Sequence, residues 1–304
     1  MMMDQAENLR QAINNLKNQQ LMNRPAVPNV APKKKARVIT VTSGKGGVGK
    51  TNISINLALA FSELGRRVVI FDADFGFANI DVLLGIVPRY TLLDVIANKK
   101  NILEVLTEGP KNIKFISGGS GVEDLVKLDK QQVDKFLENM ALLDKLADIV
   151  IVDTGAGLSE SVMSFIIAAD EVLLVTTPEP TAITDAYALI KMVSNRDKSK
   201  KIMVLVNKAE SSNEANDVLR NLVLVADKFL GIKLEPAGYI LNDNVVIKAV
   251  KQQQPFSLIY PKSQAAKNIK DISEKMISVE KDNEVQQNNG IKGFLNRLVG
   301  FMKA

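Results

Sequence analysis

The sequence predicts an α/β protein with a doubly wound, mostly parallel sheet. Short, continuously apolar runs alternate along the chain with helical patterns, and such runs are typical of strands that are covered on both faces. The runs are RVITVTS (37–43), RRVVIFDAD (66–74), IKFIS (113–117), ADIVIVD (147–153), EVLLVTT (171–177), KIMVLVNK (201–208) and EPAGYI (235–240). The segments 50–64, 129–146, 181–195 and 212–230 are long enough for crossover helices. In such a sheet a ligand binds at the carboxyl ends of the strands.

The composition limits the chemistry that this chain can perform. Its 304 residues include no cysteine and no histidine, which excludes disulfides, Cys/His zinc sites, iron–sulfur ligation and His-dependent nucleophiles. Catalysis then depends on carboxylates, lysines, backbone amides or a metal ion. No apolar run approaches the ~18 residues of a membrane span, and no secretory signal pattern is present. A cytoplasmic protein is therefore expected. The net charge of +5 leaves a solvated basic surface, anionic lipid and nucleic acid as open alternatives.

The chain is expected to carry two extensions around one globular domain. Residues 1–24 predict a short amphipathic helix from apolar residues at helical spacing, and residues 25–36 read as a basic, proline-rich linker. The globular domain spans 37–279, and a polar linker follows at 280–290.

The last segment, 291–304, predicts a second amphipathic helix. At about 100° per residue, one face collects the apolar residues Ile291, Phe294, Leu295, Leu298, Phe301 and Met302. The opposite face is cationic, which is the pattern of a helix that lies on anionic lipid. The alternative is a helix that docks on its own domain.

The stretch SGKGGVGKT (43–51) is the strongest motif of the chain. Gly44, Gly49, Lys50 and Thr51 match G-x-x-x-x-G-K-[ST], and the match follows a predicted strand and opens a predicted helix. Glycines allow successive backbone N–H groups to surround phosphate oxygens. The predicted ATP-binding residues here are Gly44, Gly46, Gly47, Val48, Gly49, Lys50, Thr51 and Asn52. Lys50 would bridge the β- and γ-phosphates, and the Thr51 hydroxyl would ligate Mg²⁺.

Carboxylates follow two of the predicted strands. Asp72 and Asp74 end the run 66–74, and Asp153 ends the run 147–153. A carboxylate at such a position can hold the waters of Mg²⁺ or orient an attacking water. The alternative for each of them is a helix cap.

The stretch KGGVGKT resembles the deviant Walker A motif of the MinD/ParA-type ATPases, and the resemblance covers roughly 37–280. It implies the MinD-like P-loop NTPase fold and a homodimer that forms face to face with ATP. It also implies that Lys45 reaches the nucleotide of the partner subunit, whereas Lys50 serves its own. Hydrolysis to ADP and phosphate would then be slow and dimer-dependent.

The resemblance assigns further residues. It implies that Asp74 positions the hydrolytic water, that Asp72 supports the magnesium shell, and that Asp153 lies in switch II. Asp72 and Asp153 would contact the waters of the metal and not the metal itself. Asn207 and Asp243 match adenine contacts of the family.

The N-terminus distinguishes among the relatives. DQAENLR (4–10) resembles the DQAxxLR motif of the FlhG family of flagellar-number regulators. This implies that Gln5 acts at the catalytic site of the FlhF GTPase and stimulates it, since a glutamine can orient a water. Flagellar switch-complex proteins are further implied partners. The ATP-bound protein is also expected to attach to the inner face of the cell membrane.

Two alternatives stay open. A MinD-type division-site ATPase would share the fold and the lipid-binding tail, but it begins almost directly at its first strand. A ParA-like DNA-partition ATPase could use KKKAR (33–37) as a nucleic-acid patch, but it needs no amphipathic tail. Nucleic acid is therefore not expected as a partner.

Overall fold

The computed structural model describes residues 35–74, 79–118, 128–282 and 290–302. The fold below is that of the unit from Lys35 to Ala304. The predicted helix at 1–24, which includes Gln5, lies outside the described residues.

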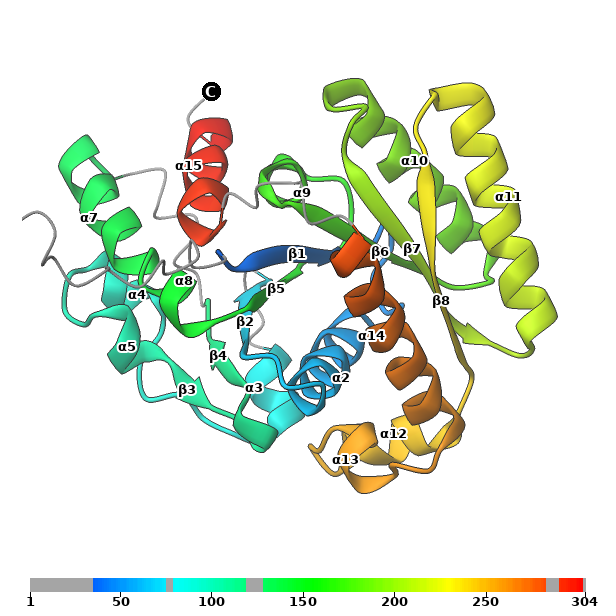
Figure 1. The fold of residues 1–304 in the computed structure, drawn as a ribbon, viewed down its shortest axis with the longest axis horizontal. Coiled ribbons are helices and arrows are strands. Elements are labelled where there is room, and N and C mark those ends of the chain that lie inside the picture. The colour runs from blue at the N-terminus through cyan, green and yellow to red at the C-terminus, as the bar shows by residue number, and fades with distance from the viewer. Residues whose placement is uncertain (1–34, 75–78, 119–127, 283–289, 303–304) are drawn as a thin grey trace, which may run out of the picture. The chain divides into compact units, whose positions relative to one another are not determined.

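Within the described residues the strands form an eight-stranded sheet in the order β3-β4-β2-β5-β1-β6-β7-β8 (Figure 1). The strands are β1 (Arg37–Thr42), β2 (Val68–Ala73), β3 (Thr107–Glu108), β4 (Lys114–Ile116), β5 (Ile149–Thr154), β6 (Glu171–Thr176), β7 (Lys201–Ala209) and β8 (Leu234–Leu241). All pairings are parallel except that of β3 with β4. The predicted doubly wound, mostly parallel sheet is confirmed. The short edge strand β3 was not predicted, because two residues give no periodic signal.

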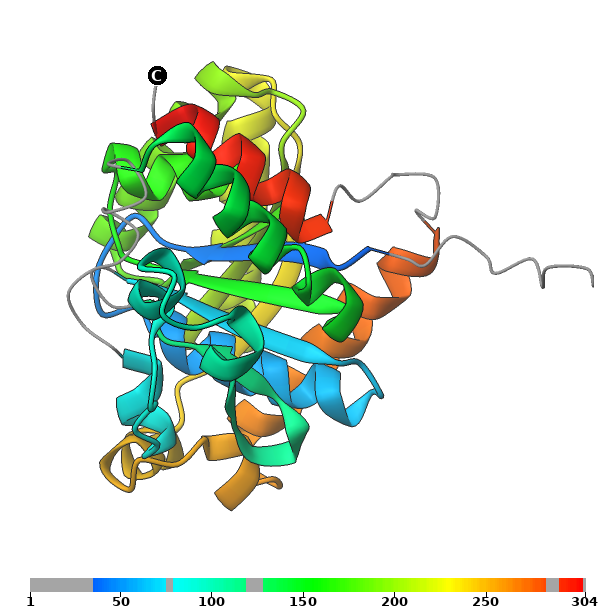
Figure 2. The same cartoon turned by 90° about the vertical axis from the view of Figure 1, so that its left-hand side faces the viewer.

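Helices cover both faces of this sheet (Figure 2). One face packs against α2 (Lys50–Glu63), α3 (Asn79–Leu84), α12 (Asn244–Lys251), α13 (Phe256–Ile259) and α14 (Gln264–Asp282). The other face packs against α4 (Leu92–Ile96), α5 (Ile102–Val105), α7 (Lys130–Met140), α8 (Leu143–Leu146), α9 (Glu160–Ala168), α10 (Pro180–Arg196), α11 (Ser212–Leu230) and α15 (Gly290–Met302). A short 3-10 turn, η1 (Pro110–Asn112), precedes β4.

The central strands are buried on both sides, which explains why their sequences do not alternate. In β1, Ile39 and Val41 point into the core under α2, while Val38 belongs to the core on the opposite face. All six residues of β1 and of β5 are buried. Apolar side chains are therefore required on both faces of these strands.

In this structure the C-terminal helix α15 docks on its own domain. The sequence left this arrangement open as the alternative to a helix that lies on lipid. Ile291, Phe294, Leu295 and Leu298 are at most 2% exposed and join the core formed with α7, α8 and α9. The Phe294 ring lies 6.2 Å from that of Phe165 in α9. The predicted apolar face exists, but in this structure most of it contacts protein. Phe301 is 46% exposed, and the side chain of Met302 lies outside the described residues.

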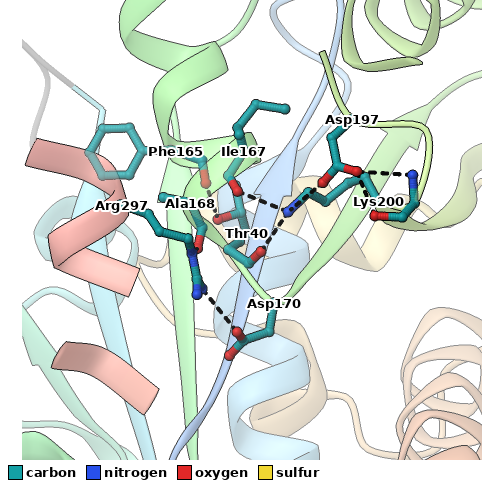
Figure 3. A network of polar contacts seen from close by, with 10 residues as sticks. Thr40, Phe165, Ile167, Ala168, Asp170, Asp197, Lys200 and Arg297 are labelled. Carbon is teal, nitrogen blue, oxygen red and sulfur yellow. Dashed lines mark hydrogen bonds and ion pairs between the residues drawn. The ribbon is translucent and has the colours of Figure 1, made fainter. Parts of the chain in front are cut away.

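Polar contacts hold both the start and the middle of α15. Asp144 Oδ1 accepts hydrogen bonds from Ile291 N at 2.9 Å and from Ala36 N at 3.3 Å. Arg297, which the sequence placed on the cationic face, donates from Nε to Ala168 O at 2.8 Å and from Nη2 to Asp170 Oδ1 at 3.0 Å (Figure 3).

A second cation binds the same end of α9. Lys200 Nζ donates to Ile167 O at 2.8 Å and to Ala169 O at 2.9 Å, and it lies 3.6 Å from Asp197 Oδ2. Lys200 and Arg297 together thus bind three successive carbonyls at the C-terminal end of α9. Positive charge at this position suits the negative end of the helix dipole.

Among the helices that the structure describes, none has the length and apolar character needed to cross a membrane.

Candidate functional site

The predicted phosphate loop connects β1 to α2 at the carboxyl end of the sheet. Gly47 and Gly49 have φ of 77° and 99°, the left-handed region that favours glycine. A Cβ on Gly49 would lie 2.5 Å from Asn207 Nδ2, and one on Gly44 would lie 2.3 Å from the carbonyl oxygen of Asp185. The glycines therefore permit both the turn and its close packing against β7 and α10.

The two lysines of this loop lie in different surroundings. Lys50 is 9% exposed and donates from Nζ to Ser43 Oγ at 3.1 Å. Burial lowers the pKa of Lys50, against the opposing attraction of Asp153 and Asp74. The Lys45 side chain is 38% exposed, and its Nζ is 2.9 Å from both Glu179 Oε2 and Thr181 Oγ1. One cation points into the loop and the other lies on the surface beside it.

Two carboxylates are buried side by side behind the loop. Asp72 on β2 is the register partner of Asp153 on β5. Burial, and then the charge of Asp153, raises the pKa of Asp72 to about 8. Burial also raises the pKa of Asp153 to about 6, although the Ser54 hydroxyl donates to its Oδ1 at 2.7 Å. A cation bound nearby would relieve the repulsion between them.

Asp74 lies closer to the open side of the site. Its Oδ2 accepts a hydrogen bond from Asn79 Nδ2 at 2.9 Å, at the start of α3. A Cβ on Gly155, in the loop after β5, would lie 3.1 Å from Asp74 Oδ1. Asp74 therefore faces the loop that follows Asp153. Its carboxylate can reach a group bound on this open side of the site.

A cavity of about 730 Å³ opens over these groups. Its lining includes the predicted residues Gly46, Gly47, Gly49, Lys50, Thr51, Asn52, Asp74, Asn207 and Asp243. Lys45, Asp72 and Asp153 are not on the lining, nor are Gly44 and Val48. The structure thus brings most of the predicted nucleotide-binding residues to one cavity and leaves Lys45 outside it.

The predicted adenine contacts also have structural roles in this chain. Asn207 Nδ2 donates to Val48 O at 2.8 Å. Asp243 caps α12, because its Oδ1 accepts from Val245 N at 3.1 Å, and its Oδ2 accepts from Ala265 N at 3.3 Å.

The residues present fit a magnesium nucleotide. Asp153 Oδ2 is buried and has no hydrogen-bond partner within the described residues, so it can accept from a metal-bound water. Lys50 is a buried cation that contacts a hydroxyl, which leaves its charge for an anion. If Mg²⁺ is bound, it would neutralise phosphate charge, with Thr51 as its ligand and Asp72 and Asp153 behind it.

Several residues of the site were not found from sequence. Ser43, Ser54, Asn79 and Glu179 orient the predicted lysines and carboxylates. Ser43 and Ser54 lie in or next to the phosphate loop and its helix, so proximity to the motif could have indicated them. Glu179 is 134 residues from Lys45, and no local pattern marks it.

The fold and this loop define a P-loop NTPase of the MinD/ParA class. The ParA family, described as "NUBPL iron-transfer P-loop NTPase", matches residues 34–277. Among solved structures, MinD from Pyrococcus horikoshii in complex with Mg-ADP is 25% identical, with a TM-score of 0.65 over 80% of this chain and 97% of that one. MinD in the MinC:MinD complex of Aquifex aeolicus is 26% identical, with a TM-score of 0.63 over 80% and 96%.

Two curated relatives narrow the class. Antiactivator FleN of Pseudomonas aeruginosa is 43% identical over 242 residues, 80% of this chain and 86% of that protein. Flagellum site-determining protein YlxH of Helicobacter pylori is 33% identical over 270 residues, 88% and 90% of the two chains. The chain belongs to the FleN/YlxH (FlhG) family of flagellar-number regulators within the ParA-type P-loop NTPases.

Proposed function

We propose that this protein is an ATP-hydrolysing switch that dimerises with ATP, attaches to the inner face of the membrane and regulates flagellum number or placement by stimulating the FlhF GTPase. The ATPase part of the proposal rests on one observation, which is that the two lysines of the phosphate loop lie in different surroundings. Lys50 lies inside its own loop, while Lys45 is outside the cavity and on the surface.

A surface lysine beside the loop suits action on a second subunit. If Lys45 neutralises charge on the transferring phosphoryl of the partner's nucleotide, hydrolysis depends on assembly. Glu179 and Thr181 hold Lys45 in the single chain, and dimerisation would exchange these contacts for phosphate. The contact with Glu179 is largely solvated, so its loss costs little.

Mixing two inactive variants tests this arrangement. Lys45→Ala and Asp74→Ala should each hydrolyse ATP far more slowly than the wild type. In a mixed dimer, the nucleotide on the Lys45→Ala subunit has its own Asp74 and the Lys45 of its partner. Phosphate release should therefore reappear on mixing. A mixture as inactive as its parts, with mixed dimers demonstrated by pull-down, would contradict action across the dimer.

Membrane attachment requires α15 to leave its dock. Most of the residues predicted to insert in lipid are buried against α7, α8 and α9. An undocked helix presents an apolar face opposite Lys292 and Arg297, and a dimer presents two such helices, so attachment gains from avidity. ATP-dependent flotation with anionic liposomes, and its absence with neutral liposomes, is the expected result.

The flagellar part is supported by the relatives and by DQAENLR (4–10). A peptide of residues 1–24 should accelerate GTP hydrolysis by the FlhF of the same organism, and the Gln5→Ala peptide should not. Switch-complex proteins are the further proposed partners. If neither peptide accelerates FlhF, the ATPase and membrane proposals remain, and a MinD-type role in division-site selection becomes the better explanation.

A further inference from the structure

The end of β7 has an irregular backbone where it passes the phosphate loop. The register of β7 with β8 shifts between Val206 and Ala209. Lys208, within this shift, has φ of 58°, a left-handed conformation that is uncommon for a residue with a side chain. Strain of this kind concentrates at functional sites. The shift places two consecutive side chains, those of Asn207 and Lys208, against the loop.

These two side chains bind two consecutive carbonyls of the loop. Asn207 Nδ2 donates to Val48 O, and Lys208 Nζ donates to Gly47 O, both at 2.8 Å. A trans peptide directs its N–H opposite to its C=O. Holding these carbonyls towards β7 therefore turns the N–H groups of Val48 and Gly49 away from β7.

We propose that Lys208 is a positioning residue that preorganises the phosphate loop for the β-phosphate of a nucleoside di- or triphosphate. Lys208 acts through the Gly47 peptide and not as a phosphate ligand. The inference rests on the proposed function, because it requires the loop to bind ATP. It adds a basic side chain from β7, outside the loop motif, that sets the direction of the loop amides before the nucleotide arrives.

A simpler role for Lys208 is attraction of any anion to the cavity. Lys251, at the end of α12, also lines this cavity and provides a matched cation. Comparing ADP with AMP distinguishes the two roles. Loop amides that bind the β-phosphate affect ADP, which has this phosphate, whereas a general cation also attracts AMP, which lacks it.

The test compares nucleotide binding by the full chain and its variants. Lys208→Met should weaken ADP binding about two- to tenfold, the range for loss of one hydrogen bond, while AMP binding changes less. The KM for ATP should rise by the same factor with kcat within about twofold. Lys208→Arg, which keeps a donor, should recover part of the affinity.

A second variant separates the contact from backbone strain. Lys208→Gly relieves the left-handed conformation but has no amine, so it should bind ADP as weakly as Lys208→Met, even if it melts at a higher temperature. ADP binding by Lys208→Met equal to wild type would overturn the proposal, as would an equal loss in Lys251→Met or a loss confined to kcat. A wild-type chain that binds no ATP would instead refute the proposed function itself.

Discussion

The contact between Asp170 and Arg297 offers a direct way to loosen α15 without changing the helix. Asp170 lies on the domain side, where its Oδ2 also accepts from Val38 N at 3.3 Å and its Oδ1 from Arg297 (Figure 3). Asp170→Asn has the same shape and can still accept one hydrogen bond. It removes the charge that holds Arg297 and keeps every residue of the predicted lipid-binding face.

The size of the effect follows from the exposure of the pair. A hydrogen bond to a charged group contributes about 1.5–3 kcal/mol. The Arg297 side chain is 31% exposed and that of Asp170 is 12% exposed, so solvent reduces the expected cost to about 1–2 kcal/mol. That cost corresponds to a rise of about 5- to 30-fold in the undocked population.

Hydrogen exchange of the α15 amides measures this population, because exchange through local opening follows the opening equilibrium. Asp170→Asn should accelerate exchange within 291–302 and increase liposome binding without ATP. Asp197→Asn is the matched control, since Asp197 contacts Lys200 in the same network but not α15. Unchanged exchange in Asp170→Asn, or an equal change in both variants, would refute this account of the dock.

Three further predictions concern the site and the tail. Asp74→Ala should accumulate an ATP-bound dimer, seen by size-exclusion chromatography, and phosphate release at the wild-type rate would count against its role. Burial raises the pKa of Asp72 to about 8, so the folded chain keeps a proton that the unfolded chain releases near pH 4. Stability without nucleotide should therefore fall as the pH rises from about 4 to about 8. Asp72→Asn should flatten that fall in denaturant titrations, and an identical slope would argue against the assignment. Truncation after Asn289 should abolish ATP-dependent liposome flotation while dimerisation persists, and retained flotation would exclude α15 as the anchor.

The sheet and the phosphate loop were predictable because their determinants are local. A strand buried on both faces needs an uninterrupted apolar run, and the loop needs glycines at fixed positions. The convergence of Asp72 and Asp153 also followed, since neighbouring parallel strands end at the same edge. These predictions depended on periodicity and spacing within single segments.

The dock of α15 and the contacts of Lys45 were not predictable in the same way. An amphipathic helix has the same apolar periodicity whether it meets lipid or a protein core, so Phe294 and Leu298 could not distinguish the two. Arg297 belongs to the cationic face by periodicity, but it binds the end of α9. Glu179 reaches Lys45 only because the fold places α10 beside the phosphate loop.

One carboxylate accepts hydrogen bonds from both ends of the domain. Asp144 Oδ1 accepts from Ala36 N, in the residue before β1, and from Ile291 N, where α15 begins. Loss of this carboxylate would therefore leave two backbone N–H groups without their acceptor at once, one just before the first strand and one in the first turn of the last helix.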